Sequence, residues 1–128
     1  KKGQPHRLFT PGDMMVLNAN HVLDMTKALA ESDAKTKVVV THHAPHTRCR
    51  NPDKGSDWAP AFVSDMDAFL EGPGLAAMGV KAWIFGHTHF NRDFTLPNGV
   101  RVVSNQQGYM FENYSNECMA NKGLLIHV

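Results

Sequence analysis

Two largely apolar segments, Val38–Val40 and Val80–Phe85, stand out in a chain of otherwise mixed polarity; Lys81 is the one charged residue in the second. Apolar segments of this kind, β-branched in the first case, are typical of strands that are covered on both faces. The first run leads into His42–Pro45, a His-His-Ala-Pro segment, and the second ends at Gly86–His89, a Gly-His-Thr-His segment. The pattern therefore predicts two buried strands that each present histidines where the strand ends.

Helical spacing of apolar residues marks two other segments. The first runs from about Asn18 to Ser32 and predicts an amphipathic helix with Asn18 or Asn20 as its N-cap. The residues before it hold glycines and prolines and are expected to be irregular. The second predicted helix starts at about Pro60 and is ended by Gly72–Gly74.

Shorter signals complete the pattern. A third strand, a hairpin turn, a fourth strand and a last strand are expected at Asp93–Leu96, Asn98-Gly99, Val100–Val103 and Leu124–Val128. Residues 46–60 have turn chemistry without periodicity, and such a long loop beside a candidate site is often functional. The order of elements predicts an α/β fold with helices layered over a sheet. In open α/β sheets ligands sit at the carboxyl ends of the strands, which is where both histidine clusters lie.

Composition narrows the class of protein without naming a partner. The chain has 128 residues, 42% of them hydrophobic and 20% charged, which is the length and composition of one globular domain. A net charge of +1 with no long basic run gives no electrostatic footprint for nucleic acid or membrane, and no stretch is long enough to span a bilayer, so we expect a soluble protein. Two cysteines, Cys49 and Cys118, exclude a framework of several disulfides and leave one bridge possible.

The two histidine clusters have the chemistry of a metal site. Neutral imidazole binds zinc, iron and manganese, and a loop that leaves a buried strand gives it a rigid base. Gly86 removes a side chain where the backbone would pass close to an ion. The rings of His87 and His89 can diverge to two metals or converge on one. Solvated loop histidines are the alternative, which the presence of two such clusters in one short chain disfavours.

At these residues the chain resembles the calcineurin-like metallophosphoesterases. His42–Pro45 resembles the fourth of the five motifs of that family, Gly86–His89 matches the fifth, and Val103–Asn105 with Gly108-Tyr109 resembles the strand and turn that follow. The resemblance implies that residues 1–128 are the C-terminal half of a single four-layer α/β/β/α sandwich. It also implies an enzyme that hydrolyses phosphoesters with two divalent or trivalent metal ions, Mn, Fe or Zn.

The resemblance carries roles only onto residues that match. It implies that His42 and His87 ligate one ion, that His89 ligates the other, and that His43 is a catalytic group that faces the substrate phosphate. The choice of His42 over His43 as ligand rests on the family pattern alone.

Three further residues are candidates for substrate binding. His46 and Arg48 follow the fourth motif and could face a substrate phosphate, where a guanidinium would clamp two oxygens. Asn105 would line the rim of the site by the same resemblance. A solvated loop and a packed turn are the corresponding alternatives. Asp93 could orient a ligand histidine, although an edge-strand aspartate is the commoner case.

The family motifs that supply carboxylates have no match here. Gly12-Asp13 and Asn20-His21 are superficially similar to two of them but lie too close together in the chain. Three neutral histidines cannot offset the charge of two divalent cations, and bridging needs a carboxylate. We therefore expect the N-terminal half of the domain to be a required partner, and this segment alone to bind at most one metal weakly and to lack turnover.

Two other interpretations stay open. The chain could be a non-catalytic fragment or interaction module, whose sheet would expose the face that the missing half covers. His87, His89, Asp93 and Gly99 also resemble the first cupin motif, which binds a single metal inside a jelly roll. The helices predicted before that motif argue against a cupin.

Overall fold

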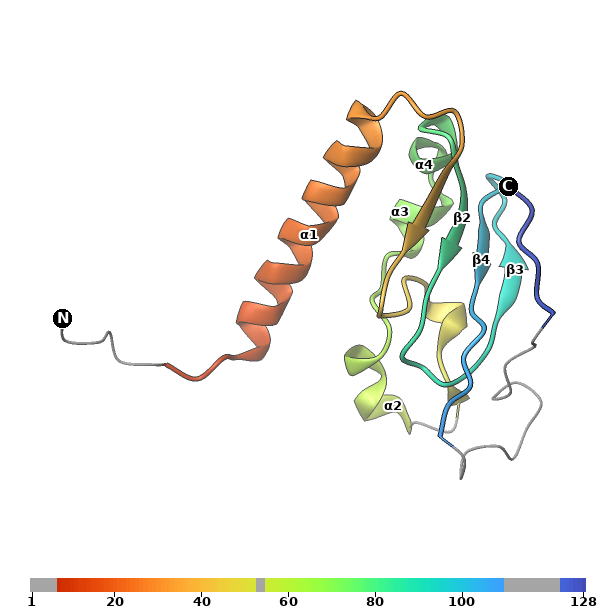
Figure 1. Ribbon diagram of the computed structural model, residues 1–128. Helices are drawn as coiled ribbons and strands as arrows, with labels where there is room; N and C mark the ends of the chain where they lie inside the picture. The colour runs from red at the N-terminus through yellow and green to blue at the C-terminus, as the bar shows by residue number, and fades with distance from the viewer. Residues whose placement is uncertain (1–6, 53–54, 110–122) are drawn as a thin grey trace. The chain divides into compact units, whose positions relative to one another are not determined.

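The computed structural model describes residues 7–52, 55–109 and 123–128 (Figure 1). The chain divides into two compact units, Lys1–Asp33 and Ala34–Val128. The second unit carries both histidine clusters and all four strands.

The first unit consists of helix α1, Pro11–Glu31. Its N-cap is Thr10, whose hydroxyl accepts from the Asp13 N–H (3.3 Å) while the Asp13 carboxylate accepts from the Thr10 N–H (2.8 Å). Arg7 also donates to Asp13 (2.6 Å) and lowers the pKa of that carboxyl well below its usual range. The predicted start at Asn18 was wrong because this capping box, with proline in the first turn, is the stronger start signal.

The second unit is built on a four-stranded sheet in the order β1-β2-β4-β3. Its strands are β1 (Lys37–Val40), β2 (Val80–Ile84), β3 (Asp93–Thr95) and β4 (Arg101–Val103). The pairs β1–β2 and β2–β4 are parallel, and β3–β4 is an antiparallel hairpin that turns at Asn98-Gly99, where Gly99 has a φ of 89°. The predictions of an α/β fold and of these four strands are confirmed. The two parallel pairs do not fit the antiparallel jelly roll that the cupin alternative requires.

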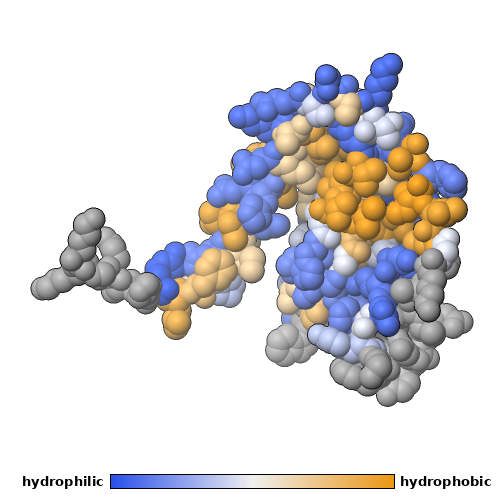
Figure 2. Space-filling view, viewed as in Figure 1, coloured by the Kyte–Doolittle hydropathy of each residue, from blue (hydrophilic) through white to orange (hydrophobic). Residues whose placement is uncertain are grey.

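The two faces of this sheet differ. Residues paired in parallel register share a face, which places Val39, Trp83 and Val102 together, and all three are buried. On the opposite face Val38 and Val40 are 41% and 70% exposed. Figure 2 shows apolar side chains gathered over the strands on the side turned to the viewer. The prediction that the first strand is covered on both faces was therefore wrong for the part of the chain that the structure describes.

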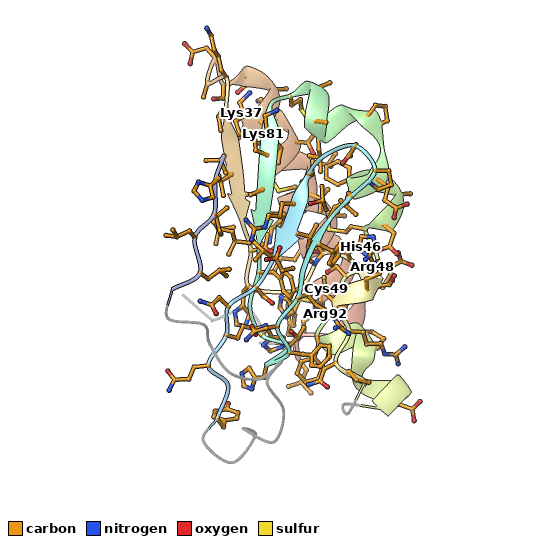
Figure 3. All side chains as sticks on the ribbon, turned by 90° about the vertical axis from the view of Figure 1, so that its right-hand side faces the viewer. Lys37, His46, Arg48, Cys49, Lys81 and Arg92 are labelled. Carbon is orange, nitrogen blue, oxygen red and sulfur yellow. The ribbon has the colours of Figure 1, made fainter. Side chains whose placement is uncertain are left out.

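Short helices lie between β1 and β2 in the chain, and the last two of them lie beside the other face of the sheet (Figures 1 and 3). They are η1 (Thr47–Cys49), α2 (Gly55–Trp58), η3 (Ala59–Ala61), α3 (Asp67–Glu71) and α4 (Pro73–Ala77). Leu70 of α3 and Leu75 of α4 are buried, and the Asn98 amide of the hairpin donates to the carbonyls of Leu70 (2.6 Å) and Gly72 (2.7 Å). The hairpin turn thus also satisfies the end of α3.

The single helix predicted from Pro60 was wrong. Residues 62–64 instead run beside the first histidine loop, where Ala44 N–H donates to the Phe62 carbonyl (3.2 Å) and Ser64 N–H donates to the Ala44 carbonyl (2.8 Å). The apolar spacing of this segment is compatible with a helix, but pairing with Ala44 satisfies its backbone in an extended form. Helical structure resumes only at Asp67.

The last predicted strand, Leu124–Val128, was also wrong. These residues have no regular secondary structure, and the Leu125 carbonyl accepts a bond from the Arg101 guanidinium at 3.4 Å. An apolar run becomes a strand only if a neighbour offers it a ladder of backbone groups. No described strand does so here.

Gly79 aligns the starts of the two central strands. Its φ is 85°, and a Cβ at this position would lie 2.7 Å from the Lys35 carbonyl oxygen, so no other residue fits without a shift. Its carbonyl accepts from Lys37 N–H (2.9 Å) at the beginning of β1. Because β1 and β2 start together and run parallel, both end at the same edge of the sheet.

Candidate metal centre

The backbone pairing of β1 and β2 continues past both strands. Thr41 N–H donates to the Ile84 carbonyl (2.9 Å), and Gly86 N–H donates to the His42 carbonyl (3.0 Å). The buried indole of Trp83 adds a side-chain bond from Nε1 to the Thr41 hydroxyl (2.9 Å). These bonds bring the two predicted histidine clusters side by side.

Three of the predicted site residues meet at this edge. The ring centroids of His42 and His87 are 4.5 Å apart, those of His43 and His87 are 4.6 Å apart, and those of His42 and His43 are 5.1 Å apart. Phe62 stacks on the His87 ring at 4.8 Å. The structure therefore brings both clusters together. Phe62, which packs against them, belongs to the segment that the sequence predicted to be a helix.

Two rings of this cluster, those of His43 and His87, have lowered pKa values. Burial, followed by the charge of His42, lowers the pKa of His43 below its ordinary value. Burial, followed by the charges of His43 and His42, lowers the pKa of His87 in the same way. A neutral imidazole keeps a free lone pair, which is the form that ligates a metal or accepts a proton.

The backbone of the second loop is in a rare conformation. His87 has a φ of 70° and His89 a φ of 51°, in the left-handed region that costs a residue other than glycine about 1–3 kcal/mol. Gly86, by contrast, has no positive φ, and a Cβ there would meet the His42 carbonyl oxygen at an ordinary 3.5 Å. The described residues therefore do not require a glycine at position 86, while the two histidines after it are held under strain.

His89, the other histidine of the Gly86–His89 segment, also contacts an aromatic ring. Its ring meets Tyr109 edge-on, with centroids 4.7 Å apart. Tyr109 comes from the segment after β4 and is 58% exposed.

His46 occupies a different environment from the one predicted for it. Its ring is 2% exposed, Nδ1 accepts from Arg48 N–H (3.1 Å), and Nε2 lies 3.2 Å from a Glu71 oxygen. The same ring also lies 3.3 Å from an Asp67 oxygen. A ring enclosed in this way anchors the loop to α3, and we no longer include His46 among the substrate-binding candidates.

The remaining candidates lie on the surface of the second unit. The Arg48 guanidinium sits 3.9 Å above the Phe94 ring, on the side of the sheet shown in Figure 3. Asn105 is exposed. Asp93 is paired with Arg101 at 2.6 Å, which lowers the pKa of Asp93, so its carboxylate is engaged away from the histidines.

The donor chemistry of the site fits a metal, but the described residues do not complete it. The neutral imidazoles suit zinc, iron or manganese. Within residues 7–52, 55–109 and 123–128, however, no group of three His, Cys, Asp or Glu side chains is arranged to hold an ion. Cys49 does not help, because it is fully buried and burial raises the pKa of its thiol to about 12. Cys118 lies outside the described residues.

Comparison with known proteins adds no family to this picture. No family model matches the chain, and no curated protein matches it. Among the helices that the structure describes, none is long and apolar enough to cross a membrane.

The sequence interpretation missed one residue that contacts the second loop, Gln106, which lies in the segment after β4. Gln106 bonds to three consecutive residues of that loop, His89 among them. Its sequence neighbourhood, Asn105 to Tyr109, had drawn attention through Asn105 and Tyr109, but nothing in the pattern distinguishes Gln106 from Gln107.

Proposed function

We propose that this chain is part of a metal-dependent phosphoester hydrolase. The observation that supports it is the meeting of His42, His43 and His87 at the carboxyl ends of two parallel strands, with ring centroids 4.5–5.1 Å apart. A cluster of histidines at this edge of a sheet, in which the pKa values of His43 and His87 are lowered, is typical of a functional site. The Gly86–His89 match to the metallophosphoesterase motif points to the same chemistry.

In this proposal the chain supplies the histidine ligands of the metal ions. As the resemblance implies, His42 and His87, whose ring centroids are 4.5 Å apart, would hold one ion and His89 a second. When bound, the ions would polarise a phosphoryl oxygen and activate water. Burial, followed by the charge of His42, lowers the pKa of His43, which favours the neutral ring whose nitrogen can accept a proton beside the substrate.

The carboxylates of the site would come from the N-terminal half of the domain. The exposed apolar side chains of Val38 and Val40 are compatible with such a second layer, because they lie on the sheet face that α3 and α4 do not cover. The same exposure is the observation that favours the second candidate, a non-catalytic interaction module. The two candidates differ in whether the histidines matter for turnover.

The experiment is a hydrolysis assay on the full-length protein with nitrophenyl phosphate mono- and diesters and added Mn²⁺. We expect His42→Ala and His87→Ala each to lower kcat/KM at least about 100-fold. Removing a residue that only hydrogen-bonds to a metal ligand already lowers metal affinity or activity about 10–100-fold, and removing the ligand itself should cost more. His21→Ala, in the exposed helix α1, is the matched control and should retain activity.

Two results would contradict the proposal. Turnover that is unchanged in His87→Ala would remove the histidine cluster from the chemistry and favour the interaction module. Manganese-dependent and His87-dependent turnover by the isolated 128 residues would show that no outside carboxylates are needed.

A further inference from the structure

The loop Gly86–Phe90 contains two strained residues, and something outside it must hold them. A non-glycine residue persists at positive φ only where the surrounding structure over-determines its conformation. His87 and His89 both have this conformation, with Thr88 between them. The Thr88 side chain is fully buried, which leaves the histidines on either side of an inward anchor.

The side-chain amide of Gln106 makes the contacts that meet this requirement. Its Oε1 accepts from His89 N–H (2.9 Å), and its Nε2 donates to the Thr88 hydroxyl (2.9 Å) and to the Phe90 carbonyl (3.3 Å). One planar group thus bonds three consecutive residues of the strained loop.

The direction of this amide is determined by its partners. A backbone N–H can only donate and a backbone carbonyl can only accept, so the oxygen must face His89 and the nitrogen must face Phe90. Of the common side chains that reach this far, glutamate has the acceptor but lacks the donors, and methionine has neither function. Glutamine satisfies both ends at once.

Gln106 is itself held in place. Its backbone N–H donates to the Asn91 side-chain oxygen (2.5 Å), and its carbonyl accepts from the Asn91 amide nitrogen (2.9 Å). Asn91 directly follows Phe90, so the two segments are tied together by both residues. The backbone of Gln106 is therefore held by Asn91, while its side-chain amide is held by the loop it bonds.

We propose that Gln106 is a positioning residue, which holds His89 in its left-handed conformation and so sets the direction of the His89 ring. As a statement about a metal ligand, this inference rests on the proposed function. As a statement about the loop, it stands on the contacts of Gln106 alone. The experiments separate the two.

The first experiment measures backbone amide exchange by NMR in the full-length protein without metal. In Gln106→Met, which keeps the length of the side chain, the His89 amide loses its acceptor and we expect its protection to fall at least tenfold. Gln107→Met is the matched control, because Gln107 is the adjacent, exposed glutamine. The Phe85 amide, bonded to the Val103 carbonyl at 3.1 Å, should keep its protection in both variants.

A conservative variant guards against a general loss of structure. Gln106→Glu restores the acceptor for His89 N–H and should recover much of the protection lost in Gln106→Met. Unchanged protection of the His89 amide in Gln106→Met overturns the inference, whatever the protein binds.

The second experiment titrates the full-length protein with Co²⁺ and follows its visible absorption. We expect Gln106→Met to raise the Kd for Co²⁺ about 10–100-fold, the usual effect of losing a group that orients a ligand, and Gln107→Met to leave it unchanged. A purely structural role would lower thermal stability without changing the affinity of the folded protein.

The outcomes distinguish the inference from the proposed function. An equal Kd in wild type and Gln106→Met overturns the positioning role toward a metal. If the wild type neither binds Co²⁺ nor shows metal-dependent hydrolysis, the proposed function fails, and the His89 amide result alone decides whether Gln106 holds the loop.

Discussion

The two histidine loops end neighbouring strands yet are held in different ways. The loop after β1 is anchored by backbone bonds between Ala44 and residues 62–64, and by the buried ring of His46. The loop after β2 is anchored by side chains, chiefly Gln106, and by the Asn51 amide that donates to the Thr88 carbonyl (3.2 Å).

The two loops also differ in the strain of their backbone. Neither His42 nor His43 has a positive φ, whereas His87 and His89 both do. A loop that pairs through its backbone can stay in ordinary conformations, while a loop held by side chains can be kept in a costly one. The second loop is therefore the one whose geometry is imposed by residues distant in the sequence.

The largest expected effect comes from replacing Trp83, whose indole links β2 to the end of β1. Trp83→Ala should lower the free energy of unfolding by about 3–5 kcal/mol, because it empties a fully buried site. It also breaks the bond to Thr41. Urea unfolding followed by circular dichroism measures this loss. Trp83→Phe should cost less, and equal losses in the two variants would mean that the indole N–H, not its volume, links the loops.

His46 tests the anchor of the first loop. His46→Phe should cost about 1–3 kcal/mol, since it leaves the Arg48 N–H without its Nδ1 acceptor in a buried position. Glu71→Gln is the control and should cost little, because its side chain is 47% exposed and an amide oxygen can still accept from the ring. The measurement is again urea unfolding. A negligible loss in His46→Phe would show that backbone pairing alone holds this loop.

Paired glycine and alanine substitutions compare the strain of the loops directly. Both substitutions remove the imidazole ring, so the difference in stability between the glycine and the alanine variant reports the strain of the backbone at that position. At His89 we expect glycine to be more stable than alanine by about 1 kcal/mol, and at His42 we expect alanine to be more stable by about 0.5–1 kcal/mol. Thermal unfolding of the four variants measures this reversal. The same order at both positions would contradict the difference between the loops.

The smallest effect is a pH dependence that both loops share. Because the pKa values of His43 and His87 are lowered in the folded state, the unfolded chain binds more protons as the pH drops. The free energy of unfolding should therefore decrease as the pH falls through about 6.5, the pKa of these groups when unfolded. Unfolding with a chelator at pH 5–8 tests this. His87→Asn should flatten the curve, and His127→Asn, outside the cluster, should not.

Local patterns predicted most of the sheet. The run Val80–Phe85 and the hairpin at Asn98-Gly99 matched β2 and the β3–β4 turn closely, because burial and turn chemistry are written in adjacent residues. The helix predicted from Pro60 failed for the opposite reason, since Ala44, distant in the sequence, pairs with that segment.

In the candidate site, too, some features follow from neighbouring residues and others from contacts between distant segments. Its histidines were identified from the chain alone, because a strand that ends in His-His or Gly-His-x-His is a local pattern. Their place at the carboxyl ends of two strands was expected, but the parallel pairing of those strands, the enclosure of His46, the stacking of Phe62 on His87 and the bonds of Gln106 were not.

The amino-acid sequence by itself thus determined which segments form the four strands and which histidines follow them, because hydrophobic period and turn chemistry act over a few residues. Which ring faces which, which sheet face stays open and which side chain holds the strained loop were decided only by the tertiary structure. These features depend on contacts between segments far apart in the chain, and no local pattern specifies such contacts.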